Sequence, residues 1–359
     1  MKEGDIITPL TEQAIGLLGS TAIIPESGKY IQSQDVAKIV CKEHLLDKDF
    51  AFYLISSNLV KQQLSAAAQQ TKIRHTSPDK IKDCIVWIPE LEEQKRIGKL
   101  LRTIDLKIEL NRQLNHNLEA MAKQLYDYWF VQFDFPDENG KPYKSSGGKM
   151  VWDKRLKREI PLLWKAKIVE EVADVYNGAT PSTVNELNYG GDIFWITPKD
   201  LSDQKQKFVY QGERNISQVG YDSCSTHLLP SNTILMSSRA PIGLLAIAKT
   251  ELCTNQGFKS FVSKSKNIAT YLYYYLQYHI TQIEQLGTGT TFKEVSREDI
   301  LKFPMLKPSD NVLDLWEEIV SALNDRQLEI QKENENLIKQ RDELLPLLMN
   351  GQVSVNYDL

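Results

Sequence analysis

Residues 91–130 read LEEQKRIGKLLRTIDLKIELNRQLNHNLEAMAKQLYDYWF and contain no proline. Apolar residues return every three or four positions, which predicts one long helix with a narrow apolar stripe. Glu92 and Glu93 lie in the first turn, where a helix prefers acidic side chains. A helix of this length would extend about 60 Å and outgrow a single globular core, so it needs a helical partner. The predicted stripe comprises Ile97, Leu100, Ile104, Leu114, Leu118, Met121, Leu125 and Tyr128, with Lys107 and Asn111 as polar interruptions.

The predicted partner is a second helix over residues 311–349. A shift of 219 positions places Pro89 on Pro308 and aligns the two stripes. The first helix is slightly basic and the second is strongly acidic, which favours pairing of one with the other over self-pairing of the acidic helix. The alternative is two unrelated surface helices, each packed on its own domain. The second stripe comprises Trp316, Ile319, Leu323, Ile330, Leu337, Leu344 and Leu347.

Composition indicates an ordinary globular protein of about two domains. The chain has 359 residues, of which 42% are hydrophobic and 25% charged, and its net charge of −4 excludes an indiscriminate polycation. Any DNA binding must therefore come from local patches. No signal peptide is visible and the longest apolar run, residues 242–248, is too short to span a membrane, so we expect a cytoplasmic protein. The scattered cysteines predict reduced thiols: Cys41, Cys84, Cys224 and Cys253.

The segment before the first long helix has a mixed α/β pattern. Apolar alternation predicts short strands, and the spacing of Phe52, Ile55 and Leu59 predicts a helix. The expected elements are strands at 5–8, 21–24, 37–40 and 85–88, a helix at 49–65 and a polar loop at 66–78.

A second α/β segment repeats the first. Ile15-Gly-Leu-Leu18 recurs as Ile242-Gly-Leu-Leu245, and Tyr53-Leu54 recurs as Tyr271-Leu272. Residues 77–81 recur as 296–300. This self-similarity predicts an internal duplication, domain and helix followed by domain and helix. The expected boundaries are 1–90 for a first domain, 91–130 for a helix, 131–159 for a linker, 160–308 for a second domain, 309–350 for a helix and 351–359 for a tail.

The expected linker is rich in Pro, Gly and Ser, which predicts an irregular surface connection. Between Lys141 and Arg158 it carries a run of basic residues and one acid, Asp153. A solvated linker and a segment that contacts phosphates both fit this composition.

Residues around this junction resemble the specificity subunits of type I restriction–modification enzymes. The similar segments are Trp129–Pro136, Gly140–Lys144, Gly147-Gly148, Arg158–Pro161 with Trp164, Gly178–Ser182, Trp195–Pro198, and Pro89–Ile97 with Asp105. The resemblance implies α/β (α+β) target-recognition domains joined by two long antiparallel helices that form a coiled-coil spacer. Each domain would read half of a bipartite site in double-stranded DNA.

The resemblance also implies partners. Methyltransferase subunits that bind S-adenosylmethionine and methylate adenine would dock on the helices, and motor-nuclease subunits would join them. The subunit itself would perform no chemistry and hold no cofactor. In agreement, the sequence has no GxGxxG motif after a strand and no GxxxxGK[ST] motif. Its histidines also lack the spacing of metal ligands.

Two equivalent loops are the main candidates for DNA contact. Glycines permit close approach of the backbone, and Thr and Lys side chains donate to phosphates or bases. Arg239 is a further candidate for guanine readout. An ordinary turn and a structural salt bridge are the respective alternatives. The loop residues are Gly287, Thr288, Gly289, Thr290, Thr291 and Lys293, with first-copy counterparts Gln70, Thr71, Lys72 and Arg74. The resemblance adds Thr180, Ser182 and Lys199.

The duplication is incomplete in one respect. Residues 160–227 of the second domain have no counterpart in the first, so we expect the first target-recognition domain to be truncated at its N-terminal side. We therefore expect residues 160–307 alone to form a complete reader, and the first domain to be completed by another chain or replaced by homodimer formation. The competing function is a stand-alone DNA-binding or scaffold protein that uses the duplicated domain and helix frame without an enzyme partner.

Overall fold

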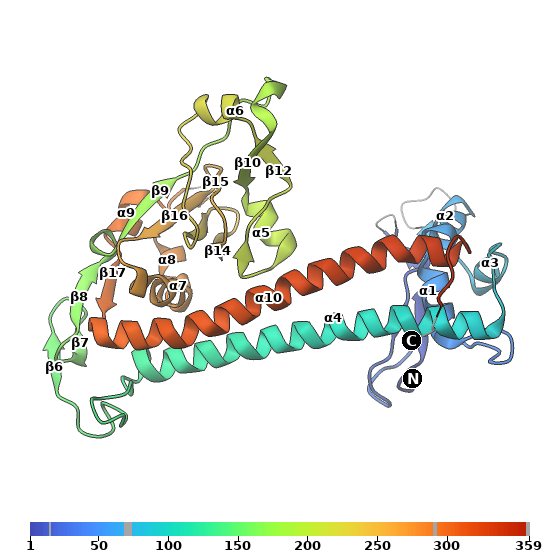
Figure 1. Cartoon of the computed structure of the whole chain (residues 1–359), viewed down its shortest axis with the longest axis horizontal. Coiled ribbons are helices and arrows are strands. Elements are labelled where there is room, and N and C mark those ends of the chain that lie inside the picture. The colour runs from blue at the N-terminus through green and yellow to red at the C-terminus, as the bar shows by residue number, and fades with distance from the viewer. Residues whose placement is uncertain (14–15, 68–73, 290–292, 357–359) are drawn as a thin grey trace. The chain divides into compact units, whose positions relative to one another are not determined.

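The computed structural model describes residues 1–13, 16–67, 74–289 and 293–356. The chain forms two compact units, which are described separately: residues 1–114 with 330–359, and residues 115–329. Both units combine small sheets with short helices, and each contains part of both long helices (Figure 1). No helix in the described ranges is both long enough and apolar enough to cross a membrane.

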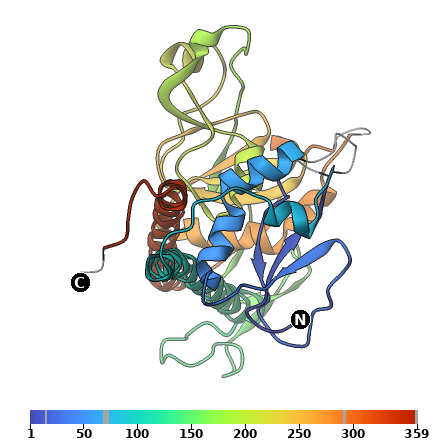
Figure 2. The same cartoon turned by 90° about the vertical axis from the view of Figure 1, so that its right-hand side faces the viewer.

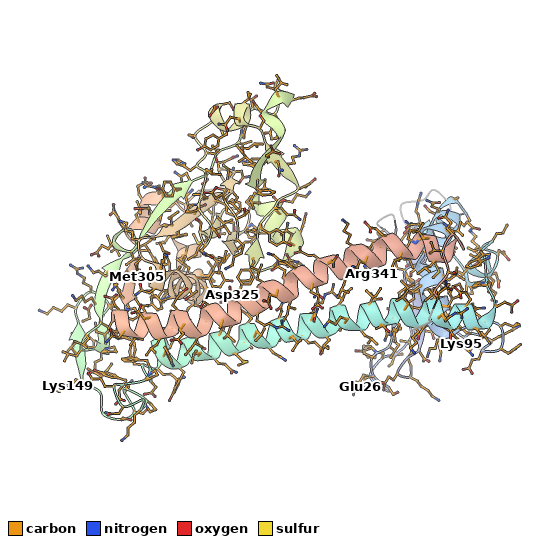
Figure 3. The ribbon with its side chains drawn as sticks, viewed as in Figure 1. Glu26, Lys95, Lys149, Met305, Asp325 and Arg341 are labelled. Carbon is orange, nitrogen blue, oxygen red and sulfur yellow. The ribbon has the colours of Figure 1, made fainter. Side chains whose placement is uncertain are left out.

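The two long helices are α4 (Leu91–Tyr126), which continues as a π-helical turn, η1 (Asp127–Val131), and α10 (Asp310–Met349). They are antiparallel in both units. In the first unit, Arg341 Nη1 lies 2.9 Å from Asp105 Oδ1, and Figure 3 labels Arg341 on α10. In the second unit, Asn115 and Gln327 exchange side-chain to backbone hydrogen bonds of 3.3 and 3.2 Å. The predicted antiparallel pairing is confirmed.

The face that each helix buries differs from the prediction. Leu118 and Leu337 were expected to be buried and are half-buried, while Leu114, Met121, Tyr128, Ile319 and Leu347 of the predicted stripes are exposed. One partner helix covers only part of each side chain in the stripe, so the rest stays exposed. A straight α-helix has 3.6 residues per turn, so a stripe that repeats every seven residues gradually turns away from the partner. The buried face of α4 is Ile97, Leu101, Ile108, Asn111, Ala122 and Tyr126.

The middle of the helix pair is polar. In the first unit, Asn111 donates a 2.7 Å hydrogen bond to Glu333, and Lys107 lies 3.3 Å from the other oxygen of this carboxylate. Buried amides such as these specify register because a shifted pairing would leave them without partners. The buried polar residues of α10 are Asn324, Gln327, Gln331 and Asn334.

The first unit holds a three-stranded antiparallel sheet of order β3-β1-β4 (Figure 2, blue). Its strands β1 (Ile6–Pro9), β3 (Ala22–Ile23) and β4 (Val36–Ile39) confirm three of the predicted strands. The predicted helix breaks at Ser57, whose ψ of 152° is extended, into α1 (Lys48–Ser56) and α2 (Asn58–Ala67). The remaining elements are β2 (Thr11–Glu12), β5 (Arg74–His75) and α3 (Pro78–Lys82).

Gly98 explains how this unit attaches to α4. A Cβ atom at this position would lie 2.7 Å from the backbone nitrogen of Phe50, so glycine permits the start of α1 to contact α4. The buried Gln94 side chain accepts from Asp47 N and donates to the carbonyls of Leu45 and Pro89. The only glycine of the predicted long helix therefore marks its contact with the first domain.

The predicted strand at residues 85–88 was wrong. No strand is present there, in the segment that follows α3. The Gln63 side chain accepts from Ile85 N at 2.8 Å and donates to Ile85 O at 2.9 Å. A strand requires a neighbouring strand, and none lies beside this segment in the part of the chain that the structure describes.

The second unit is built on a five-stranded sheet of order β11-β14-β13-β16-β9. Its strands are β9 (Ala173–Asn177), β11 (Phe208–Val209), β13 (Ile234–Ser238), β14 (Ile242–Ala248) and β16 (Phe258–Ser263). A smaller sheet holds β10 (Tyr189–Ile196), β12 (Arg214–Ile216) and β15 (Cys253–Thr254), and a third pairs β8 (Lys165–Ile168) with β17 (Pro304–Lys307). The helices are α5 (Pro198–Gln204), α6 (Gln218–Asp222), α7 (Ala269–Tyr278), α8 (Ile280–Gln285) and α9 (Arg297–Leu301), with 3-10 turns η2 (Val169–Glu171), η3 (Glu186–Asn188) and η4 (Lys266–Ile268).

The junction between the first long helix and the second domain belongs to the core. Within the residues expected as a linker, a hairpin forms from β6 (Met150–Asp153) and β7 (Arg158–Pro161). Phe133 and Phe135 are buried, and their ring centroids lie 5.4 and 4.9 Å from the ring centroid of Trp164. Aromatic burial of this kind stabilises the attachment of the domain to the helices.

Candidate nucleic-acid interface

Several loops of the second unit gather at one end of the five-stranded sheet. Strand β9 ends at Asn177, which pairs with Lys259 near the start of β16. Strand β13 ends at Ser238, whose backbone N–H donates 2.7 Å to Gly257 O. The loops that follow β9 and β13 and the loop that precedes β16 therefore lie together.

The Gly/Thr loop reaches the same end. Thr288 and Glu294 form a two-way backbone pair of 3.0 Å in each direction, which closes the loop at its base. Val295 N donates 3.1 Å to Ser238 O and so fixes the loop beside β13. Gly289 has a φ of +123°, which favours glycine. A Cβ at Gly287 would lie 2.8 Å from Ile242 Cδ1, while Thr288 and Lys293 are exposed. Thr290 and Thr291 lie outside the described residues.

Arg239 meets the base of this loop. Its Nη1 lies 3.7 Å from Glu294 Oε2, and both side chains are partly exposed. The structure thus joins two candidates that are far apart in the sequence, Arg239 and the loop that ends at Lys293. The next residue, Ala240, has a φ of +49°, an uncommon conformation for a residue with a side chain.

Lys259 is a site residue that the sequence analysis missed. Its ammonium lies 3.2 Å from Glu294 Oε1 and 3.4 Å from Ser238 Oγ, and the residue is only 5% exposed. A buried lysine requires a charged or polar partner, and Glu294 supplies the carboxylate. A lysine between aromatic residues of a strand, Phe258-Lys-Ser-Phe261, was the signal available in the sequence.

Thr180 and Ser182 lie on the loop after β9. The Thr180 hydroxyl donates to the side-chain oxygen of Gln256, which belongs to the loop before β16. Gly178 permits this contact because a Cβ there would overlap Asn255 O at 2.1 Å. Ser182 is exposed, and its carbonyl accepts from Asn188 Nδ2 at 2.9 Å. Thr180 is thereby placed at the gathered loops.

Lys199 is near the same loops but is engaged by acids. It follows Pro198, which would contact a Cβ at Gly257. Its Nζ lies 2.7 Å from Glu213 and 3.8 Å from Asp203, and the hydrogen bond to Glu213 raises the pKa of Lys199. Since these groups are exposed, the pairs can exchange for other partners at little cost.

In the first unit, Gln70, Thr71 and Lys72 lie outside the described residues, and Arg74 is held by structural contacts. Arg74 Nη1 donates 2.8 Å to Ser65 Oγ and lies 3.5 Å from the buried carboxylate of Glu12. Burial alone would raise the pKa of Glu12. Three backbone N–H groups, from Gly16 to Leu18, and Arg74 outweigh burial and lower this pKa.

The two loops close on their sheets in the same manner. Thr76 N donates 2.8 Å to Leu10 O in the first unit, as Val295 N donates to Ser238 O in the second. Each loop base carries an ion pair, with the charges reversed. The arginine is on the sheet side in the second unit (Arg239) and on the loop side in the first (Arg74). The predicted equivalence of the loops is therefore seen in their attachment.

Among the described residues, no three His, Cys, Asp or Glu side chains are grouped so that they could hold a metal ion. The gathered side chains are hydrogen-bond donors and cations, the groups that contact DNA phosphates and bases.

Comparison with known proteins identifies the family. The family model described as the type I restriction modification DNA specificity domain matches residues 2–120 and 161–340. The type I restriction enzyme MjaIX specificity subunit of Methanocaldococcus jannaschii is 35% identical over 197 residues, which are 53% of this chain and 46% of that protein, less than half its length. The HindI specificity subunit of Haemophilus influenzae is 24% identical over 90% of this chain and 81% of its own. The crystal structure of a type I S subunit from M. genitalium shares the fold, with a TM-score of 0.61 at 15% identity over 97% of this chain and 83% of that one. The chain belongs to the type I restriction modification DNA specificity family.

Proposed function

We propose that this chain is the DNA-recognition subunit of a type I restriction–modification complex and that its second unit reads one part of a bipartite site with the gathered loops. The observation that carries the proposal is the meeting of Arg239 with the Gly/Thr loop through Glu294. Family membership supports the same function. As a specificity subunit, the chain supplies recognition in the cytoplasm, and partner subunits supply the chemistry.

The contacts suggest a different role for each of Arg239, Lys293 and Lys259. Arg239 is half-exposed and paired with Glu294 at 3.7 Å, a separation at which a partly exposed ion pair contributes little. Its guanidinium can therefore leave Glu294 for a guanine, which it would contact through two hydrogen bonds. Exposed Lys293 is suited to a phosphate. Buried Lys259 holds Glu294 in place when Arg239 moves from Glu294 to the guanine.

Methyltransferase subunits are the proposed partners of the long helices, with motor-nuclease subunits joining where cleavage occurs. In the first unit, α4 exposes Leu106, Leu110 and Leu114, which are 54%, 52% and 39% accessible. They are four residues apart and so lie on one face of the helix. A row of exposed leucines is typical of a surface that another protein covers.

The function is tested by expressing the chain with and without a type I methyltransferase subunit and selecting bound DNA from a random pool. We expect one bipartite sequence to be enriched and its adenine methylated only when both proteins are present. Substitution of Arg239 and Lys293 should reduce the enrichment and relax the selected sequence at one base pair. Lys266→Ala is the matched control, because Lys266 lies beyond the opposite end of β16.

Two results would contradict parts of the proposal. Specific DNA binding without association with a methyltransferase subunit would favour a stand-alone reader. Enrichment of the same sequence to the same degree after the Arg239 and Lys293 substitutions would show that recognition uses another surface. Leu110→Glu, with His116→Glu as its control at an exposed position on another side of the same helix, tests the docking face by co-purification.

A further inference from the structure

One short segment closes two strand edges in the second unit. Strand β8 pairs with β17, with Lys167 opposite Met305 and Lys165 opposite Lys307. Val169 N donates 3.1 Å to Phe303 O, so positions 303, 305 and 307 direct their backbone groups toward β8. After the turn η2, strand β9 pairs with the outer edge of β16. Residues 165–177 therefore pair with one edge of β17 and with one edge of the five-stranded sheet.

The opposite side of β17 faces its own helix. The Tyr275 hydroxyl donates 3.0 Å to Pro304 O, and the Tyr271 hydroxyl donates to Leu306 O. Positions 304 and 306 therefore point inward while the positions beside them point to β8. Figure 3 labels Met305 on this strand, and its side chain is fully buried.

In the first unit, the segment equivalent to β17 also bonds toward its own helix on one side, but no described strand pairs with its other side. The shift of 219 places Ile85 on Pro304, and Ile85 likewise bonds inward, to Gln63 of α2. Val86 and Ile88 correspond to Met305 and Lys307. Within the described ranges, no protein group bonds the backbone N–H or C=O of Val86 or Ile88.

The sheet edge beside this segment is also open. Strand β4, the counterpart of β16, pairs with β1 on one edge, and no other described strand adjoins it. The first four residues of β16 are buried, whereas β4 has one exposed and three half-buried residues.

Apolar side chains of the open segment are also exposed. Trp87 is 40% accessible, whereas its counterpart Leu306 is 5% accessible, and Ile88 is 49% accessible. Open backbone groups beside exposed apolar residues form a template for an added strand.

We propose that the edge formed by β4 and residues 84–88 binds a strand-turn-strand segment of the same kind as residues 165–177. Main-chain hydrogen bonds to Val86 and Ile88 would hold the segment. Apolar side chains like Val169, Val172 and Val175, all buried in the second unit, would cover the exposed core. A second copy of this chain is a poor donor, because its own segment already pairs with β17 and β16. The proposal is independent of the proposed DNA contacts.

Hydrogen exchange on the full chain tests the proposal at single amides. In the chain alone, the Val86 and Ile88 amides should exchange fast, while Met305 and Lys307 exchange slowly. Addition of a synthetic peptide of residues 162–178 should slow Val86 and Ile88 by about tenfold or more, as pairing in a ladder protects amides. Met305 and Lys307 should not change.

Two variants act as controls. A peptide with Lys167→Pro lacks the N–H that faces the position of Val86, so it should protect neither amide. Val86→Pro in the chain should abolish protection of Ile88, while Met305 reports that the second unit remains folded. Absence of protection by the unmodified peptide would overturn the proposal. Protection without peptide would also overturn it, and dependence of that protection on protein concentration would identify a second copy as the occupant.

Discussion

Lys207 Nζ lies 2.8 Å from Glu119 Oε2, and this contact joins the second domain to α4 within the second unit. The same ammonium lies within hydrogen-bond distance of the side-chain oxygens of Tyr274 and, on α10, of Asn324 and Gln327, at 2.6, 2.7 and 3.1 Å. Burial lowers the pKa of Lys207 to about 8, so the side chain remains charged at pH 7. One buried cation therefore satisfies oxygens from α4, α7 and α10.

Replacement of Lys207 by Met should lower the free energy of unfolding of the second unit by about 1–3 kcal/mol, because the half-buried Glu119 would keep only Lys123, 3.7 Å away, as a cation and the polar groups around Lys207 would lose a partner. The measurement is urea unfolding at pH 7. A double variant that also carries Glu119→Gln should recover part of the loss. Lys266→Met, an exposed control, should change the free energy by less than about 0.5 kcal/mol. Equal effects of the Lys207 and Lys266 variants would contradict a structural role for the contact.

Acid should loosen the first unit through Glu12. Its pKa is lower in the folded chain than the ordinary value of 4.5, so its contribution is complete above that value and is lost as pH falls through the lower, folded pKa. The Leu18 amide, which donates 3.0 Å to Glu12, is the probe. Below about pH 4.5 its protection against hydrogen exchange should fall in the natural chain and vary less in Glu12→Gln. The same pH profile in both would exclude Glu12 as the cause.

The sequence was sufficient to predict the two helices and the duplication, because a helical period and the recurrence of similar segments are properties of the chain alone. It was insufficient for the buried face of the helices, since that face depends on what packs against them. Residues 85–88 have the composition of a strand, but no strand of the described residues lies beside them, so they form none. Local pattern cannot report the absence of a partner.

The candidate site was predicted in part for the same reason. The chemistry of Arg239 and of the Gly/Thr loop predicts each of them separately. The contact between them through Glu294 depends on the order of strands in the sheet, which the local sequence does not report. Lys259 was missed because its value as a buried cation appears only once Ser238 and Glu294 surround it.

Truncations on α4 should distinguish its buried face from its exposed face. Ile108→Ala should cost about 2–5 kcal/mol, as removal of a buried aliphatic side chain does. Leu110→Ala should cost less than about 0.5 kcal/mol, because Leu110 is exposed. Thermal unfolding of the chain without partners is the measurement. A larger loss for Leu110 than for Ile108 would show that the helices pair through the opposite face.

Lys293→Ala should weaken DNA affinity for all sequences alike and reduce the slope of log affinity against log salt by about one, since one phosphate contact is lost. Binding measured between low and physiological salt gives this slope. Lys266→Ala should leave the slope unchanged, because its side chain lies beyond the other end of the sheet. A reduced affinity with an unchanged slope would show that Lys293 contacts something other than a phosphate.

Arg239→Ala should instead relax preference at one base pair, by about 1–3 kcal/mol between the preferred base and its competitors. Arg239→Lys should relax it as well, because an ammonium cannot form the two parallel hydrogen bonds of a guanidinium. Competition binding with sites changed at each position gives the difference. Glu294→Gln provides the internal check. It removes the carboxylate that holds Arg239 in the free chain, so affinity should stay equal or rise if Arg239 leaves Glu294 for DNA. A loss of preference in Glu294→Gln as large as in Arg239→Ala would mean that the ion pair itself shapes the interface and that Arg239 does not read a base.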